Sequence, residues 1–199
     1  MEDHECRANY LPRLPRPYYQ SAAVVHWTLT IWDRATGWLS ERLHSRWREL
    51  LLHCAAREGL FCPVYCLMPD HLHLIWMGLR PDSDQLNGMA FLRTYLEPEL
   101  APARFQPQAH DHVMRESSTT RDALTTAFSY DLLNPVRKGL VSAPSEWPYR
   151  GCVVPGYPKL DPLDARFRIL FWKLYRDQRD PKCDFHILPP VGGSEVRAS

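Results

Sequence analysis

The sequence predicts an α+β fold in which helices cover mainly one face of an antiparallel sheet. Three observations support this fold class. Apolar and polar residues alternate over 24–32, a period of two that is typical of a half-buried strand. Apolar residues then recur at helical spacing over 43–54. The order strand, helix, strand, strand, helix, helix is typical of an antiparallel sheet with helices packed on it.

Capping and turn signals position the elements along the chain. Ser40 caps the first helix and Gly59 ends it. The third helix is expected to stop near Asn134, because Pro135 disfavours helical geometry at the residue before it. Strands are expected at 24–32, 63–67 and 71–77, and helices at 40–59, 85–96, 119–134 and 163–177. A proline-rich loop is expected at 97–108 and a turn-rich segment at 142–157.

Three parts of the chain differ in composition. Residues 1–21 form an arm rich in proline and arginine, 22–155 the main domain, and 156–199 a C-terminal helical extension with a tail. Charge is nearly balanced, with 24 Lys+Arg against 23 Asp+Glu. This balance excludes binding of an anionic partner by overall charge, so clustered arginines or a metal ion must hold any such partner.

Membrane and secretory classes are not indicated. No apolar stretch approaches the length of a membrane span, and the first five residues are too acidic for a signal peptide. The 6 cysteines form no CxxC pair and are expected to be reduced thiols of a cytoplasmic protein. A small zinc protein that uses Cys62 or Cys66 with nearby histidines is a weaker alternative to ordinary packing of these thiols.

The run Tyr65–Ile75 contains the most informative pair of residues, His71 and His73. Side chains alternate along a strand, so both imidazoles point to one face, about 7 Å apart along the strand, while Leu72 and Leu74 point to the other. Two imidazoles on one face can bind a metal ion. A pair of polar residues on a solvated strand face is the plain alternative. A second pair, His110 and His112, is interpreted as a structural or DNA-contacting loop, with a second metal site as the weaker alternative.

The third helix carries Tyr130 and, one turn later, Asn134. Residues four apart lie on one helix face, so a phenol and a carboxamide could meet the two imidazoles if this helix crosses the open face of the sheet. Two imidazole nitrogens and one amide oxygen would leave positions on a divalent cation for phosphate oxygens. Tyr130 could then attack a phosphodiester. The alternatives are a core tyrosine and an asparagine helix cap.

These motifs resemble a known family. Tyr65–Ile75 looks like the His-hydrophobic-His motif of single-tyrosine HUH transposases, and Tyr130–Val141 resembles the tyrosine-helix signature of their REP-associated branch. Residues 26–30, 109–116 and 147–149 fit the same branch, so the resemblance covers roughly residues 22–152. Asp131 stands where the family usually has an aliphatic residue, and Lys138 where it commonly has alanine.

The resemblance implies a ferredoxin-like HUH endonuclease, cytoplasmic and associated with the nucleoid of a prokaryote. Tyr130 would be the nucleophile that forms a 5′-phosphotyrosine, and His71, His73 and Asn134 would bind Mg²⁺ or Mn²⁺. The substrate would be single-stranded hairpin DNA such as repetitive extragenic palindromes (REPs). Residues that flank this site and could contact DNA phosphates are Arg115, Arg137, Lys138 and Arg150.

Several questions stay open at the level of sequence. The main alternative to an enzyme is a domesticated hairpin-binding protein that has lost turnover. The chain could be a monomer or a homodimer, and in a dimer the tyrosine could serve its own histidines or those of its neighbour. The DNA target is not given by the sequence.

Overall fold

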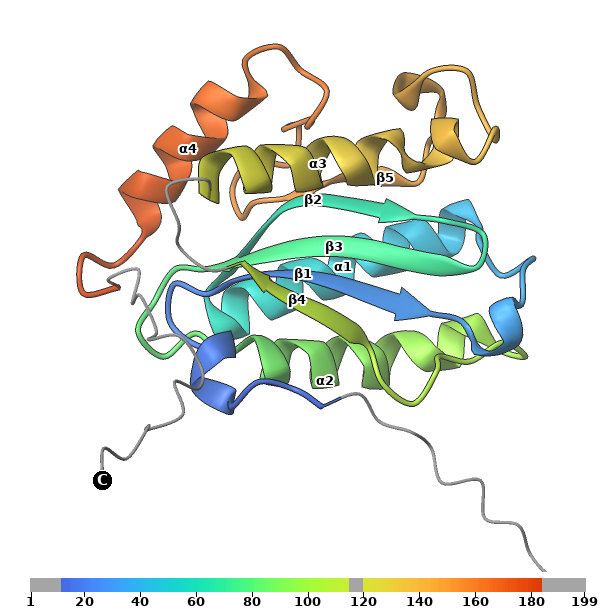
Figure 1. Cartoon of the computed structure of the whole chain (residues 1–199), viewed down its shortest axis with the longest axis horizontal. Helices are drawn as coiled ribbons and strands as arrows, with labels where there is room; N and C mark the ends of the chain where they lie inside the picture. The colour runs from blue at the N-terminus through green and yellow to red at the C-terminus, as the bar shows by residue number, and fades with distance from the viewer. Residues whose placement is uncertain (1–11, 115–119, 184–199) are drawn as a thin grey trace, which may run out of the picture.

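The structure is a computed structural model, and it describes residues 12–114 and 120–183. In this part of the chain, five strands form one sheet in the order β4-β1-β3-β2-β5, and all neighbouring strands are antiparallel (Figure 1). The strands are β1 (Val24–Thr30), β2 (Leu60–Leu67), β3 (His71–Gly78), β4 (His110–Met114) and β5 (Arg150–Val153). The predicted α+β class with an antiparallel sheet is confirmed.

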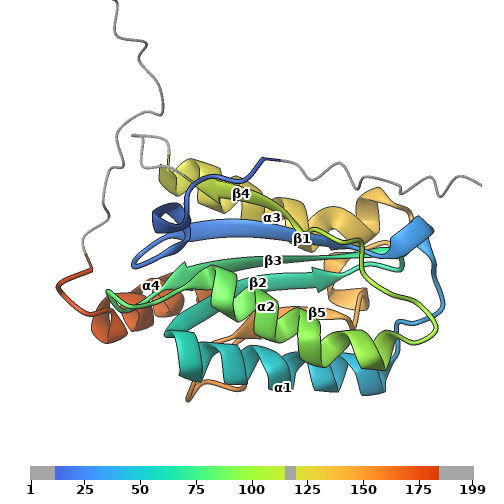
Figure 2. The ribbon, with the colours of Figure 1, turned by 90° about the horizontal axis from the view of Figure 1, so that it is seen from below.

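Helices pack on both faces of this sheet. The α-helices are α1 (Glu41–Glu58), α2 (Gln85–Leu96), α3 (Thr120–Arg137) and α4 (Phe167–Gln178), and short 3-10 helices lie at Arg16–Tyr19, Trp32–Arg34, Glu97–Leu100 and Pro144–Glu146. α1 and α2 lie on one side of the sheet and α3 on the other (Figures 1 and 2). As the sequence suggested, α3 crosses the face that α1 and α2 leave open.

The second face is covered more completely than the sequence predicts, because α4 packs there beside α3. Phe171 and Tyr175 of α4 pack against Phe61 of β2, with ring centroids 6.2 and 6.3 Å from that of Phe61. The Tyr175 hydroxyl also donates a hydrogen bond to the Gly78 carbonyl oxygen at 2.9 Å. The C-terminal extension expected from sequence therefore contributes to the core through its apolar helix face.

The pairing of β1 with β3 decides which side chains face which helices. Trp27 lies opposite Leu74, and both belong to the core cluster closed by α1 and α2. Thr28 lies opposite His73 in the same register. Since side chains alternate along a strand, Thr28, His26 and His73 all face α3. The predicted division of β3 into an apolar face and a histidine face is present.

α1 begins and ends where the sequence predicts. The Ser40 hydroxyl accepts a hydrogen bond from the Leu43 amide at 3.2 Å, which satisfies one of the free amides of the first turn. Gly59 follows the last turn with φ of 60°, in the left-handed region that glycine adopts without steric cost. The helix buries Trp47 against the face of the sheet opposite the one that carries the histidines.

α3 extends further than expected. The helix passes through Pro135 and ends at Arg137 instead of stopping near Asn134. Pro135 lies in the last turn of the helix, whose end is closed by a Schellman motif. In that motif the Leu140 amide donates to the Pro135 carbonyl and the Gly139 amide to the Val136 carbonyl, both at 2.9 Å, with Gly139 at φ of 68°.

Two short edge strands correct the interpretation of their segments. The segment with His110 and His112, expected to be a loop, is β4, which pairs with β1 at one edge of the sheet. β5, four residues long, lies inside the segment expected to be turns and pairs with β2 at the other edge. Both were missed because an edge strand needs no continuous apolar face, and their sequences alternate weakly.

The described part of the N-terminal arm packs on the domain. Tyr19 is fully buried, and the Arg16 guanidinium donates to the Asp84 carboxylate at 2.8 Å. The cysteines in the described residues are free and buried, which agrees with the expected reduced thiols: Cys54, Cys62, Cys66, Cys152 and Cys183. Among the described helices, none has the length and hydropathy needed to cross a bilayer.

Candidate active site

His71 and His73 converge on the face of β3 that α3 covers. Both residues are buried, and their Nε2 atoms lie 2.9 Å apart. The rings are perpendicular, with centroids separated by 4.6 Å. Two nitrogens at this separation are close to the spacing of neighbouring ligands on one metal ion, for which metal–nitrogen distances are about 2.0–2.1 Å.

Each imidazole is held from behind through Nδ1. Asp70 accepts a hydrogen bond from His71 Nδ1 at 2.6 Å, so neutral His71 carries its hydrogen there and keeps a lone pair on Nε2. His73 Nδ1 is hydrogen-bonded to the Thr28 hydroxyl at 3.1 Å. Outer partners of this kind fix the tautomer and orientation of metal-binding histidines. The Nε2 atoms are thus the ones presented to a ligand.

The surroundings of His73 favour its neutral form, and those of Asp70 favour an ionised carboxylate. Burial, followed by the nearby His71 and His26, lowers the pKa of His73 to about 3. Burial alone would raise the pKa of Asp70, but hydrogen bonds from His71 and Arg34 bring it below its usual value. A neutral imidazole is the form that binds a metal ion.

Tyr130 of α3 lies next to this pair in the same chain. Its ring centroid is 5.9 Å from that of His73, edge to face, and the residue is 43% exposed. The Arg137 guanidinium carbon lies 4.8 Å from the centre of the Tyr130 ring. A partly exposed phenol beside paired imidazoles and a guanidinium has the composition of a site for phosphoryl transfer.

Asn134 lies one turn after Tyr130, on the side of α3 that faces the sheet. The residue is 4% exposed, and its Nδ2 atom has no hydrogen-bond partner in the described part of the chain. An unpaired amide in a buried position costs free energy unless something binds it. A metal ion would bind the amide oxygen and not this Nδ2 donor, so the candidacy of Asn134 as a ligand still rests on its burial beside the paired histidines and on its spacing with Tyr130.

His26 and Asp131 also belong to the site, and the sequence-based analysis did not assign them. Asp131 is fully buried, and its Oδ1 lies 3.0 Å from His26 Nε2 and 3.9 Å from His73 Nδ1. Burial raises the pKa of Asp131, and the contact with His26 opposes this rise. The available signal was an acidic residue three positions before Asn134, on the inward side of α3.

The donor set fits a divalent metal ion. His26, His73 and Asp131 offer one ligand atom each within 4.8 Å of one another, and His71 Nε2 is a further donor atom near His73. Neutral imidazoles, a carboxylate and an amide are ligands that first-row divalent ions accept. A coordination site in this cluster is therefore chemically reasonable, although the donor set does not select one ion.

Cysteine takes no part in this cluster within the described residues. Cys62 belongs to the core on the opposite face of the sheet. Cys66 lies opposite His73 in the β2–β3 register, but its sulfur contacts Met68 at 3.9 Å and burial raises its pKa well above the usual range. The zinc alternative with cysteine ligands gains no support.

The predicted phosphate-contacting residues are only partly brought to the site. Arg137 and Lys138 lie exposed at the end of α3 that carries Tyr130. Arg150 is used elsewhere, since its guanidinium donates to Asp161 at 2.7 Å and to the Pro144 carbonyl at 2.9 Å. Arg115 lies outside the described residues.

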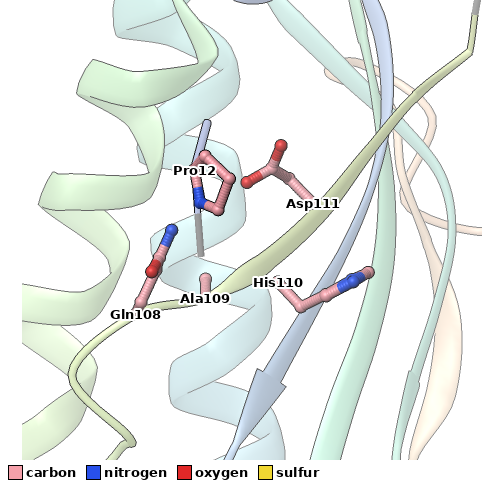
Figure 3. Close-up of a pocket in the computed structure, with 5 residues that line it drawn as sticks. All are labelled: Pro12, Gln108, Ala109, His110 and Asp111. Atoms are coloured by element: carbon pink, nitrogen blue, oxygen red, sulfur yellow. The ribbon is translucent and has the colours of Figure 1, made fainter. Parts of the chain in front are cut away.

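The second histidine pair lies at the edge of the sheet. His110 and His112 are exposed on β4, and they share the α3-facing side with Thr28 and His26, their partners in register. A small cavity of about 290 Å³ borders this strand, lined by Pro12, Gln108, Ala109, His110 and Asp111 (Figure 3). Asp111 faces away from the imidazoles, and none of the residues lining this cavity belongs to the paired-histidine site.

Comparison with known proteins supports the resemblance noted in the sequence. No family model matches the chain. A Haemophilus influenzae protein, whose curated name is that of a REP-associated tyrosine transposase, is 22% identical over 142 residues, covering 66% of this chain and 80% of that protein. A solved structure of a REP-associated tyrosine transposase bound to a REP hairpin has a TM-score of 0.57 and 20% identity, covering 70% of this chain and 82% of the other. The resemblance is confirmed at low identity, and the fold is shared.

Proposed function

We propose that the protein is a metal-dependent endonuclease and strand transferase of the REP-associated tyrosine transposase type, acting on single-stranded hairpin DNA. One observation carries the proposal: the ring centroid of Tyr130 lies 5.9 Å from that of His73, and the Nε2 atoms of His73 and His71 lie 2.9 Å apart. The similar proteins support the substrate class, since one is named for its association with REPs and the other is bound to a REP hairpin.

In this proposal His71, His73 and Asn134 hold Mg²⁺ or Mn²⁺. The bound ion would withdraw negative charge from a phosphate oxygen and so make the phosphorus easier to attack. Asp70 and Thr28 keep the two rings turned so that their Nε2 atoms face the same point. These residues prepare the site before DNA arrives, which lowers the cost of organising it during the reaction.

Tyr130 supplies the nucleophile. Its hydroxyl oxygen would form a bond to phosphorus while the bond from phosphorus to the 3′ oxygen breaks, which gives a 5′-phosphotyrosine and a free 3′ hydroxyl. The proton lost by the phenol balances the one gained by the leaving oxygen. Attack by a 3′ hydroxyl on the phosphotyrosine reverses these bond changes and joins the strands. Arg137, beside the ring, would stabilise the negative charge that develops.

The same chain contributes the phenol and the imidazoles, which supports a site that acts in cis even if the protein forms a homodimer. We propose that Arg115, Arg137 and Lys138 contact DNA phosphates near this site. Arg150 is left out of this set because Asp161 and the Pro144 carbonyl already bind its guanidinium. With nearly balanced overall charge, these local contacts would supply much of the affinity for DNA.

The test is formation of a covalent adduct with hairpin DNA. The protein is incubated with Mn²⁺ or Mg²⁺ and a labelled single-stranded hairpin taken from repeats beside its own gene. Wild-type protein should give a labelled band that survives denaturation, and Tyr130→Phe should abolish that band while keeping hairpin affinity. Tyr157→Phe, at another tyrosine that is 40% exposed, is the matched control and should react as wild type.

The enzymatic function would be contradicted if no hairpin is cleaved and His71→Ala binds hairpin DNA at full strength without a metal ion. That pattern would favour the domesticated hairpin-binding protein instead. Adduct formation by Tyr130→Phe would also contradict the proposed nucleophile.

A further inference from the structure

Asp131 is a buried carboxylate with unused hydrogen-bonding capacity. It is 0% exposed, and in the described part of the chain its Oδ2 has no hydrogen-bond partner, while its Oδ1 lies 3.0 Å from His26 Nε2. An isolated carboxylate in such a place is costly, so a charged neighbour has to compensate it. Two imidazoles lie within 4 Å of it, with His26 Nε2 at 3.0 Å and His73 Nδ1 at 3.9 Å from Oδ1.

The helix and the sheet together bring Asp131 to this position. It follows Tyr130 directly and lies three residues before Asn134, so all three lie within one turn of α3. His26 of β1 and His73 of β3 share the sheet face beneath this turn, with ring centroids 5.4 Å apart. Asp131 therefore connects the helix that carries the phenol to the strands that carry the imidazoles.

The direction of the contact shows what Asp131 can do. It approaches His73 from the Nδ1 side, whereas His71 approaches from the Nε2 side at 2.9 Å. Asp131 thus lies on the Nδ1 side of His73 at 3.9 Å, where its charge acts on the imidazole without a hydrogen bond, whereas Asp70 accepts a hydrogen bond from His71 Nδ1 at 2.6 Å. A carboxylate behind a metal-binding imidazole raises the basicity of that imidazole and fixes its ring.

The alternative is that Asp131 is itself a metal ligand together with His26 and His73. A metal ion at that point would need His73 Nδ1, which is already hydrogen-bonded to Thr28 at 3.1 Å. It would also leave out His71, whose Nε2 faces His73 and not Asp131. The two donor sets share one imidazole but use opposite nitrogens of it, so they describe two different sites.

We propose that Asp131, paired with His26, is a positioning residue for the metal site formed at the Nε2 atoms of His71 and His73. Its charge orients His73 and strengthens the ligand, and it does not touch the metal ion. The inference rests on the proposed function, because it takes His71 and His73 as the metal ligands. In this chain the same residue also anchors the helix that carries the nucleophile.

The experiment measures binding of Co²⁺ and Mn²⁺ to the full chain, without DNA, by calorimetry and by the visible absorption of bound Co²⁺. Asp131→Asn keeps the shape of the side chain and removes its charge. We expect its dissociation constant to rise about 10- to 100-fold with one ion still bound, and the Co²⁺ spectrum to keep the intensity of an unchanged donor set. Asp161→Asn, at a carboxylate paired with Arg150, should bind as wild type.

A second variant guards against a folding defect. His26→Gln removes the partner of Asp131 from the side of β1 and should weaken metal binding in the same direction, while thermal unfolding shows that the domain is folded. Affinity of both variants within about twofold of wild type would overturn the positioning role. Complete loss of binding in Asp131→Asn, with binding retained in His71→Ala, would overturn it too and assign Asp131 as a direct ligand.

This result separates from the proposed function. If wild type binds the metal ion, Asp131→Asn binds it more weakly and wild type never cleaves DNA, the proposed enzymatic function is wrong and the positioning role of Asp131 stands. Cleavage by wild type with unchanged metal affinity in Asp131→Asn would remove the inference alone.

Discussion

The molecule contains two His-x-His pairs on the same face of one sheet, and they differ in almost everything except spacing. His71 and His73 lie on β3, which is flanked by β1 and β2, and they are 7% and 6% exposed. His110 and His112 lie on the edge strand β4 and are exposed. The first pair meets Tyr130 of α3, and the second borders a shallow cavity.

The difference lies in what stands behind each pair. Asp70 and Thr28 fix the rings of the β3 pair through Nδ1. In the β4 pair the intervening Asp111 faces the opposite side, where it contacts Arg13 at 3.1 Å and the Tyr19 hydroxyl at 2.5 Å. The two pairs therefore share their spacing but not their surroundings, and metal-binding imidazoles usually have a partner that holds the ring, as the β3 pair has.

The largest expected effect separates the two pairs directly. His71→Ala or His73→Ala should weaken binding of Mn²⁺ at least about 100-fold and abolish the covalent adduct, because each variant removes one facing Nε2. His110→Ala and His112→Ala should keep both properties. Calorimetry and a denaturing gel measure the two effects. Metal binding that depends on His110 or His112 instead would reverse the assignment.

A smaller effect concerns the support behind the first pair. Asp70→Asn should raise the dissociation constant for Mn²⁺ about 10-fold, because His71 loses a charged partner while both ligand nitrogens remain. Asp111→Asn is the matched change in the second pair, and we expect no change in metal affinity from it. Equal losses in the two variants would show that the comparison is wrong.

The smallest effect concerns His44, an imidazole used for structure and not for the site. Burial, and then the Arg48 charge, lower its pKa to about 4. Since the folded-state pKa is below the unfolded value of about 6.5, the unfolded chain binds the proton more tightly, and stability falls as pH drops from about 6.5 towards 4.

This pH effect is measured as the free energy of unfolding in urea at pH 7 and pH 5. Wild type should lose on the order of 1 kcal/mol more than His44→Gln over this interval. The neutral imidazole accepts a hydrogen bond from the Tyr65 hydroxyl at 2.8 Å, and Arg48 donates to the same oxygen at 2.7 Å, so protonation of His44 would oppose both contacts. An identical pH dependence in the two proteins would contradict this role.

Much of the site follows from local periodicity. The period of a strand puts His71 and His73 on one face, and the period of a helix puts Tyr130 and Asn134 within one turn, so both pairs were predictable. The end of α3 was not predictable in this way, because the hydrogen bonds that close the helix after Pro135 come from the amides of Gly139 and Leu140 further along the chain.

The contributions of His26 and Asp131 depend on tertiary structure. His26 approaches His73 only through the register of β1 with β3, and no local pattern states that register. Asp131 is buried because α3 crosses the sheet at this point and not one turn earlier or later. Likewise β4 and β5 are strands because β1 and β2 offer free edges, not because their own sequences require it.

The account depends most on the identity of the residue that becomes linked to DNA. The direct measurement is peptide mass mapping of the adduct formed with hairpin DNA and Mn²⁺, after digestion of both components. The account predicts a nucleotide on the peptide that contains Tyr130, and none in His71→Ala. A nucleotide on any other tyrosine, or the same yield in His71→Ala, would contradict it.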